Sequence, residues 1–188
     1  MKLLLTTILA SILIGCGGTT ENKATAPEQV TKLPESFFTT ERPRDVKDLV
    51  EVKKTAKKGD EVTFLSRIGG RKNSSFVPTL SMMIVADPAL KSCEVMSEED
   101  HCATPEDYCC EDRDLLRAGL GTIRFMDESG DAYPFSVDGD HGLEILKYVV
   151  ITGKVHDISD NGNFIVDASR VWVGGKPLYS DLRAGSGE

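Results

Sequence analysis

The sequence predicts a mainly β protein, a small Greek-key barrel with short helices and a cysteine-rich insertion. Three observations predict this fold class. Short β-rich runs separated by turn residues recur along the chain. A glycine pair at 69–70 ends the first of these runs. The last two runs, at 148–157 and 164–173, flank an Asn-Gly pair, which is the strongest short-range signal for a hairpin.

The other elements are expected from their local pattern. A short helix is expected within 42–59, because Asp45 can cap its first turn and Gly59 can end it. Apolar and β-branched residues between turn signals predict the remaining strands. In chain order, these elements are strands at 60–70 and 79–87, two strands within 121–139, helical turns at 141–147 and the closing hairpin.

The N-terminus has the pattern of an export signal. An apolar run from Leu3 to Ile14 follows the single basic residue Lys2. The run is too short for an ordinary membrane-spanning helix and is typical of a secretory signal. It ends in "LIGC", which resembles the bacterial lipobox. That resemblance implies a signal peptide at 1–15, lipid on Cys16 that can include palmitate on the new amine, and a location in the cell envelope.

The rest of the chain divides by composition. Residues 16–44 are rich in Thr, Glu, Pro and Lys and are expected to form a flexible tether after the lipidated cysteine. An OB-like domain is expected at 45–180, with an insertion at about 88–120 and a frayed tail at 181–188. Gly17 rather than aspartate follows the lipidated cysteine, which favours the outer membrane in a diderm cell.

Two stretches carry a family resemblance. "GDEVTFLSRIGG" at 59–70 and "YVVITGKVHDISDNGNFIVDASRVWV" at 148–173 resemble OB-fold domains of the tRNA-anticodon-binding type. The segment "TPEDYCCE" at 104–111 resembles a T-P-x-D-Y-C-C-E segment in uncharacterised lipid-anchored OB-fold proteins. The first resemblance implies a small Greek-key barrel, and the second implies no activity.

The charge and composition argue against a nucleic-acid partner. OB barrels that bind nucleic acid combine a positive groove with stacking aromatic residues. Here the net charge is −8 and only 6% of the residues are aromatic. The aromatic residues at strand positions are expected in the core instead. They are Phe64, Phe125, Tyr133, Phe135, Tyr148 and Trp172.

Four cysteines lie within the insertion. An even number in an exported protein favours two disulfides. A bond between the adjacent Cys109 and Cys110 would be strained, so each is expected to pair with Cys93 or Cys102, in either arrangement. A helix expected at 105–119 would direct the two adjacent thiols to different sides. This hypothesis predicts two separate sulfur pairs.

A metal site is the alternative interpretation of the insertion. Four thiolates, or three thiolates with His101, can complete a tetrahedral zinc shell. The spacing contains no C-x-x-C pair, which makes zinc the second hypothesis and a redox dithiol the third.

The leading hypothesis for function is a membrane-anchored, non-enzymatic binding or scaffold domain with no cofactor. Its partners would be the membrane, reached through the lipid, and an envelope protein or a saccharide. A metal-binding lipoprotein and a divergent envelope enzyme are the alternatives. The enzyme is less favoured, since the sequence has no G-x-S-x-G, phosphate loop or H-E-x-x-H motif. The acids of "VDGDHGLE" at 137–144 are expected to be solvated turn residues.

Overall fold

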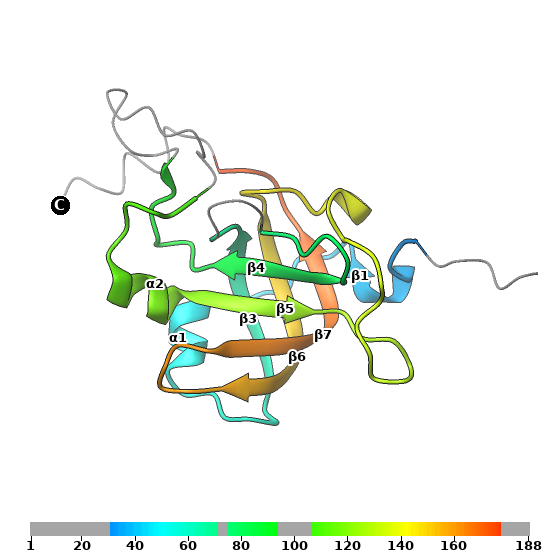
Figure 1. The fold of residues 1–188 in the computed structure, drawn as a ribbon, viewed down its shortest axis with the longest axis horizontal. Helices are drawn as coiled ribbons and strands as arrows, with labels where there is room; N and C mark the ends of the chain where they lie inside the picture. Colours follow the sequence, from blue (N-terminus) through cyan, green and yellow to red (C-terminus); the bar gives the residue numbers. More distant parts are fainter. Residues whose placement is uncertain (1–30, 71–74, 94–106, 178–188) are drawn as a thin grey trace, which may run out of the picture.

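The computed structural model describes residues 31–70, 75–93 and 107–177. Its long strands are β3 (Glu61–Ile68), β4 (Met82–Ala86), β5 (Leu120–Arg124), β6 (Tyr148–Ile158) and β7 (Phe164–Val173). β3 pairs with β4 and β6, β5 pairs with β4 and β7, and β6 pairs with β7. These pairings close a barrel in which only β5 and β7 run parallel (Figure 1). The predicted mainly β, OB-like Greek-key barrel is therefore confirmed.

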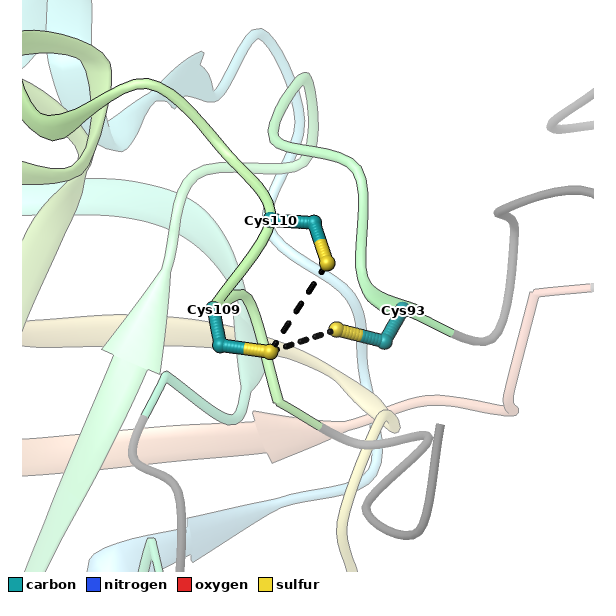
Figure 2. A group of neighbouring side chains, drawn as sticks. All are labelled: Cys93, Cys109 and Cys110. Atoms are coloured by element: carbon teal, nitrogen blue, oxygen red, sulfur yellow. Dashed lines mark hydrogen bonds between the residues drawn. The ribbon is translucent and has the colours of Figure 1, made fainter. Parts of the chain in front are cut away.

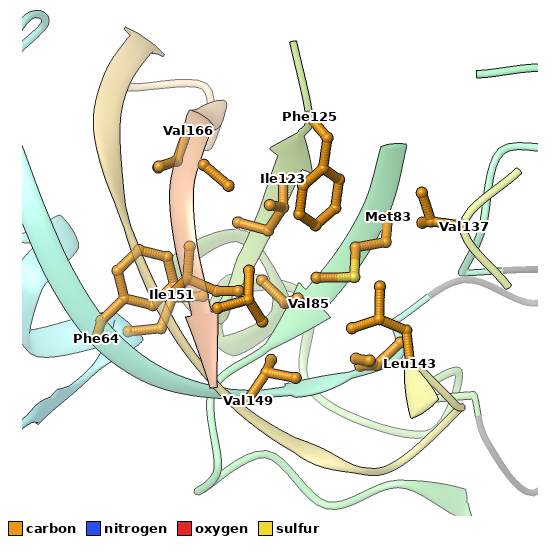
Figure 3. Packing of buried hydrophobic residues seen from close by; sticks show 14 of the residues in the cluster. Phe64, Met83, Val85, Ile123, Phe125, Val137, Leu143, Val149, Ile151 and Val166 are labelled. Atoms are coloured by element: carbon orange, nitrogen blue, oxygen red, sulfur yellow. The ribbon is translucent and has the colours of Figure 1, made fainter. Parts of the chain in front are cut away.

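The barrel interior is filled by apolar side chains from all five strands (Figure 3). Successive side chains of a strand point to opposite faces, so alternate positions meet inside the barrel. The interior residues include Phe64, Met83, Val85, Ile123, Ile151 and Val166, all fully buried.

The expected aromatic core is only partly correct. Phe64 and Phe125 are fully buried, and Tyr133 and Phe135 pack against the core from its edge. Trp172 lies instead on the outer side of β7, where the guanidinium of Arg42 stands 5.5 Å from the centre of its ring. Tyr148 is likewise half-buried outside the core cluster. Both belong to the last hairpin, whose neighbouring positions alternate between the two faces of the sheet.

Part of the segment predicted as tether packs on the barrel. A 3-10 turn, η1 (Glu35–Phe37), leads into β1 (Phe38–Thr39), which pairs in parallel with β7. Leu33 is buried, and its backbone N–H donates to the Asp140 carboxylate over 2.7 Å. The prediction of a flexible tether is thus wrong for these residues. Local composition could not reveal it, because Leu33 and β1 are held by residues more than a hundred positions away.

The first helix is shorter than expected. β2 (Lys47–Asp48) pairs in parallel with β3, and α1 (Leu49–Lys53) follows directly. The N-cap position belongs to Asp48, whereas Asp45 lies before β2 with a positive φ of 52°. No helix among the described residues has the length and hydropathy needed to cross a bilayer.

The second helix begins late in the insertion. α2 (Arg113–Gly119) starts where the Asp112 carboxylate accepts hydrogen bonds from the backbone of Asp114 and Leu115. Such a cap satisfies two of the first N–H groups of a helix and fixes its start. The helix predicted from 105 onward therefore does not include Cys109 and Cys110.

Only the first of the two strands expected within 121–139 forms. β5 ends at Arg124, and beyond it only an isolated bridge joins Met126 to Ala132. Pro134 lacks the N–H that a strand ladder needs. The chain instead covers one end of the barrel with Val137, and a 3-10 turn, η3 (Asp140–Gly142), replaces the expected helical turns. The hairpin bounds at 148–157 and 164–173 agree with β6 and β7 to within one residue.

Lys53 joins three separate segments. Its ammonium donates to the carbonyls of Arg117, Leu120 and Gly162, over 2.8, 2.8 and 2.9 Å. These carbonyls belong to α2, β5 and the turn between β6 and β7. Burial lowers the pKa of Lys53 from 10.5 to about 8. The side chain therefore holds α1 against the rest of the barrel at some cost in desolvation.

We expect Lys53→Met to destabilise the fold by about 1–3 kcal/mol, because three carbonyls lose their donor. The effect should depend on pH. Between about 8 and 10.5 the unfolded state binds more protons at Lys53 than the folded state does. The unfolding free energy of the wild type should therefore rise relative to that of Lys53→Met across this window. Urea unfolding of both proteins at pH 7, 8, 9 and 10 measures the difference. A difference that stays constant or shrinks would contradict the prediction.

Candidate metal centre

The insertion is closed at its base by contacts between its first and last residues. The backbone N–H of Asp87, directly after β4, donates to the carbonyl of Gly119 over 2.7 Å. Gly119 leaves room for Leu90, since a Cβ built there would lie 2.8 Å from a Leu90 methyl carbon. Ala86, Leu90 and Tyr108 form a second small apolar cluster. This cluster supports the two segments that carry the cysteines.

Those two segments are held together by hydrogen bonds from backbone N–H groups. The N–H of Cys93 donates to the carbonyl of Asp107 over 2.7 Å. The N–H of Lys91 donates to the Glu111 carboxylate over 2.9 Å. The segment that ends at Cys93 therefore lies beside the segment that begins at Asp107.

Cys109 and Cys110 occupy the middle of a tight turn. The N–H of Glu111 donates to the carbonyl of Tyr108 over 3.0 Å, which closes a four-residue turn. In that conformation both side chains leave the backbone at the same corner. Their Sγ atoms lie 3.8 Å apart. The helical geometry that would separate the two thiols is absent here.

The three described thiols of the insertion converge on one place (Figure 2). The Sγ atoms of Cys93 and Cys109 are 3.4 Å apart, and all three lie within 4.8 Å of one another. Cys93 is buried, whereas Cys109 and Cys110 are exposed. A disulfide has a sulfur separation of about 2.05 Å. A tetrahedral zinc shell with Zn–S bonds of about 2.3 Å places its sulfurs about 3.8 Å apart.

Two of the sequence candidates lie outside the described residues, namely His101 and Cys102. The structure thus brings together Cys93, Cys109 and Cys110 from the predicted set. The lipidation candidate Cys16 also lies outside the described residues.

Sequence reasoning missed the polar groups beneath the thiols. Arg67 on β3 is fully buried, and its guanidinium lies 5.7 Å from the centre of the Tyr108 ring. Ser92, which directly precedes Cys93, is buried as well. Asp107, two residues before Cys109, is also buried. The sequence feature that could have indicated these buried polar groups is Arg67 itself, a charged residue among the apolar residues of a predicted strand.

The expectation of solvated acids at 137–144 is wrong for Asp140. This carboxylate is 8% exposed and accepts from Leu33, while its other oxygen lies 2.8 Å from Nδ1 of His141. The Nε2 atom of His141 lies 3.0 Å from the Glu35 carboxylate, and its ring stacks on Phe38. The group secures the N-terminal segment and has the contacts of a structural site.

A pocket of about 370 Å³ lies on another side of the barrel. Leu65, Tyr148 and Trp172 contribute apolar walls, and Arg42 and Asp48 contribute charge. Burial, followed by the nearby Asp87 and Glu51, raises the pKa of Asp48. Arg42 and the backbone at Gly174 both lie against the Trp172 ring. The Trp172 ring therefore forms one wall of this pocket and is held there by two neighbours.

Comparison with protein-family models, curated proteins and solved structures gives no match for this chain. The geometry of its own residues therefore carries the functional argument.

Proposed function

We propose that this protein is a lipid-anchored component of the bacterial cell envelope whose OB-like domain binds a thiophilic metal ion, zinc or copper(I), through its insertion. The observation that carries the metal site is the convergence of the Cys93, Cys109 and Cys110 sulfurs within 4.8 Å. The lipid anchor rests on the lipobox-like sequence that ends at Cys16. The centre is proposed as a binding and structural one, not as a catalytic one.

The arrangement supports a metal better than a pair of staples. Two disulfides would place the sulfurs in separate pairs, each with a single close neighbour. Here the Cys109 sulfur lies 3.4 Å from that of Cys93 and 3.8 Å from that of Cys110. These separations are close to the sulfur spacing of about 3.8 Å around a tetrahedral ion. The common centre therefore supports coordination as the role of the adjacent pair.

The donor atoms select the class of metal. Thiolate sulfur is a soft ligand that favours zinc and copper(I), whereas magnesium and calcium prefer oxygen ligands. Three thiolates leave one position of a tetrahedral zinc shell to be filled, and Cys102 and His101 are the sequence candidates for it. A bound ion would join the two described segments of the insertion, 87–93 and 107–119.

Metal content and thiol state together test this proposal. We expect the full-length protein, purified in detergent without oxidant, to bind one equivalent of zinc or copper(I) and to retain four reduced thiols in the insertion. Serine variants of Cys93, Cys109 and Cys110 should each lose stoichiometric binding. Cys16→Ser is the matched control, since it removes a cysteine outside the insertion and should bind metal as the wild type does.

Elemental analysis and intact mass of the same sample decide the outcome. A domain mass lower by four hydrogens, with no metal and no thiol available to alkylation, would overturn the metal site and support two disulfides. Reduced protein that binds neither Zn²⁺ nor Cu⁺ would overturn it as well. Comparison of Cys102→Ser with His101→Ala then identifies the fourth ligand.

A further inference from the structure

Arg67 is a buried charge without an acidic partner among the described residues. It lies on β3 with none of its surface exposed. No ion pair formed by the described residues includes it, although Asp87 and Asp107 are buried in the same part of the fold. An ionised group is costly to bury unless an opposite charge compensates it.

The contacts of Arg67 place it against both segments that carry the thiols. Its Nη2 atom donates to the carbonyl of Leu90, three residues before Cys93. Its guanidinium faces the ring of Tyr108, which directly precedes Cys109. The guanidinium therefore touches both segments of the insertion that carry sulfur ligands. It is the only cation that the described contacts place against both segments.

Several polar atoms in this region also lack hydrogen-bond partners among the described residues. They are Nε and Nη1 of Arg67, Oγ of Ser92 and Oδ2 of Asp107. Buried polar atoms are nearly always satisfied, so these atoms are open to a further partner such as a water molecule or an ion. The two from Arg67 are N–H donors of a cation, which suit an anionic acceptor.

We propose that Arg67 is a positioning residue for the metal centre and supplies the positive charge that offsets an anionic metal–thiolate complex. This inference rests on the proposed function. A zinc ion with three or four thiolates carries a net charge of −1 or −2, and copper(I) with three thiolates carries −2. The buried guanidinium stabilises such a complex over a neutral one. The site is therefore built for an all-thiolate or nearly all-thiolate shell, and metal binding and Arg67 stabilise each other.

A comparison of Arg67→Met with the wild type, each with and without metal, tests this coupling. Competition with a chromogenic chelator should show Zn²⁺ affinity lowered by about 10–100-fold in Arg67→Met, as for other groups that support metal ligands. Arg67→Lys, which keeps the charge, should recover most of the affinity. Without metal, the thermal midpoint of Arg67→Met should equal or exceed that of the wild type, because an uncompensated charge has been removed. The metal-induced rise in midpoint should then be smaller in the variant.

Arg124→Met is the matched control. Arg124 lies on β5, which β4 separates from β3, and pairs with Asp167 over 2.7 Å. Its loss should leave Zn²⁺ affinity unchanged. If Arg67→Met does not fold, Arg67→Gln takes its place, because glutamine keeps a donor for the Leu90 carbonyl and carries no charge.

The outcomes separate the two proposals. A wild-type protein that binds no metal would overturn the proposed function and this inference together. A wild-type protein that binds Zn²⁺, beside an uncharged Arg67 variant with the same affinity and the same metal-induced rise in midpoint, would overturn the inference alone. Arg67 would then serve only to hold the Leu90 carbonyl.

Discussion

Gly153→Ala is expected to destabilise the barrel by about 3 kcal/mol or more, because overpacking against backbone cannot be relieved by a change of rotamer. A Cβ at this position would lie 2.3 Å from the Asp167 carbonyl oxygen and 2.9 Å from the Ala168 Cα. Both atoms belong to the backbone of β7. The register between β6 and β7 shifts at Thr152 and Gly153, so the two strands approach each other closely at this irregularity.

The thermal midpoint provides the measurement. A loss of about 3 kcal/mol corresponds to a fall of roughly 6–12 °C in a domain of this size. Gly175→Ala is the control, because a Cβ at Gly175 would meet no atom within 4 Å. An unchanged midpoint for Gly153→Ala would show that β6 and β7 do not pair in this register.

Cys16→Ser is expected to abolish membrane association. The lipobox-like sequence predicts two or three acyl chains on the cysteine, and each buried methylene adds about 0.8 kcal/mol of membrane affinity. Several chains together hold a protein far more firmly than one, and serine provides no thioether for them. The expected result is a complete move of the protein from the membrane fraction to the soluble fraction.

Labelling with a palmitate analogue checks the anchor directly. Wild type and Cys110→Ser should both incorporate the label, since the second variant changes an exposed cysteine of the insertion and leaves the anchor intact. Equal labelling of Cys16→Ser and wild type would contradict the prediction. Membrane association that persists without label would assign it to another part of the chain.

The local sequence pattern was sufficient to predict most strands. β3, β6 and β7 have β-branched and aromatic residues at alternating positions, and the Asn-Gly turn determines where the last two strands separate. The prediction failed where one residue opposes the pattern. Pro134 interrupts the second strand expected within 121–139, and Asp112 starts a helix that the sequence pattern placed several residues earlier.

The candidate site was predictable only in part. The clustering of cysteines at 93–110 marked the insertion, and the spacing of the thiols left disulfides and zinc as competing hypotheses. The turn that brings Cys109 and Cys110 together is closed locally by the Glu111 N–H, but Cys93 reaches it only through the hydrogen bond that joins its segment to Asp107. Arg67 belongs to the site through its contacts with the Leu90 carbonyl and the Tyr108 ring, and its place among the apolar residues of a predicted strand does not reveal these partners.

Local sequence pattern predicted most of the strands and the position of the insertion, because each depends on residues that are close together along the chain. The parallel pairing of β5 with β7, the docking of Leu33 on Asp140 and the convergence of the three sulfurs could be seen only in the folded structure. Each of these joins segments that a long stretch of chain separates. Such contacts form only when burial and hydrogen bonding across the whole barrel outweigh the entropy lost in closing the loops between them.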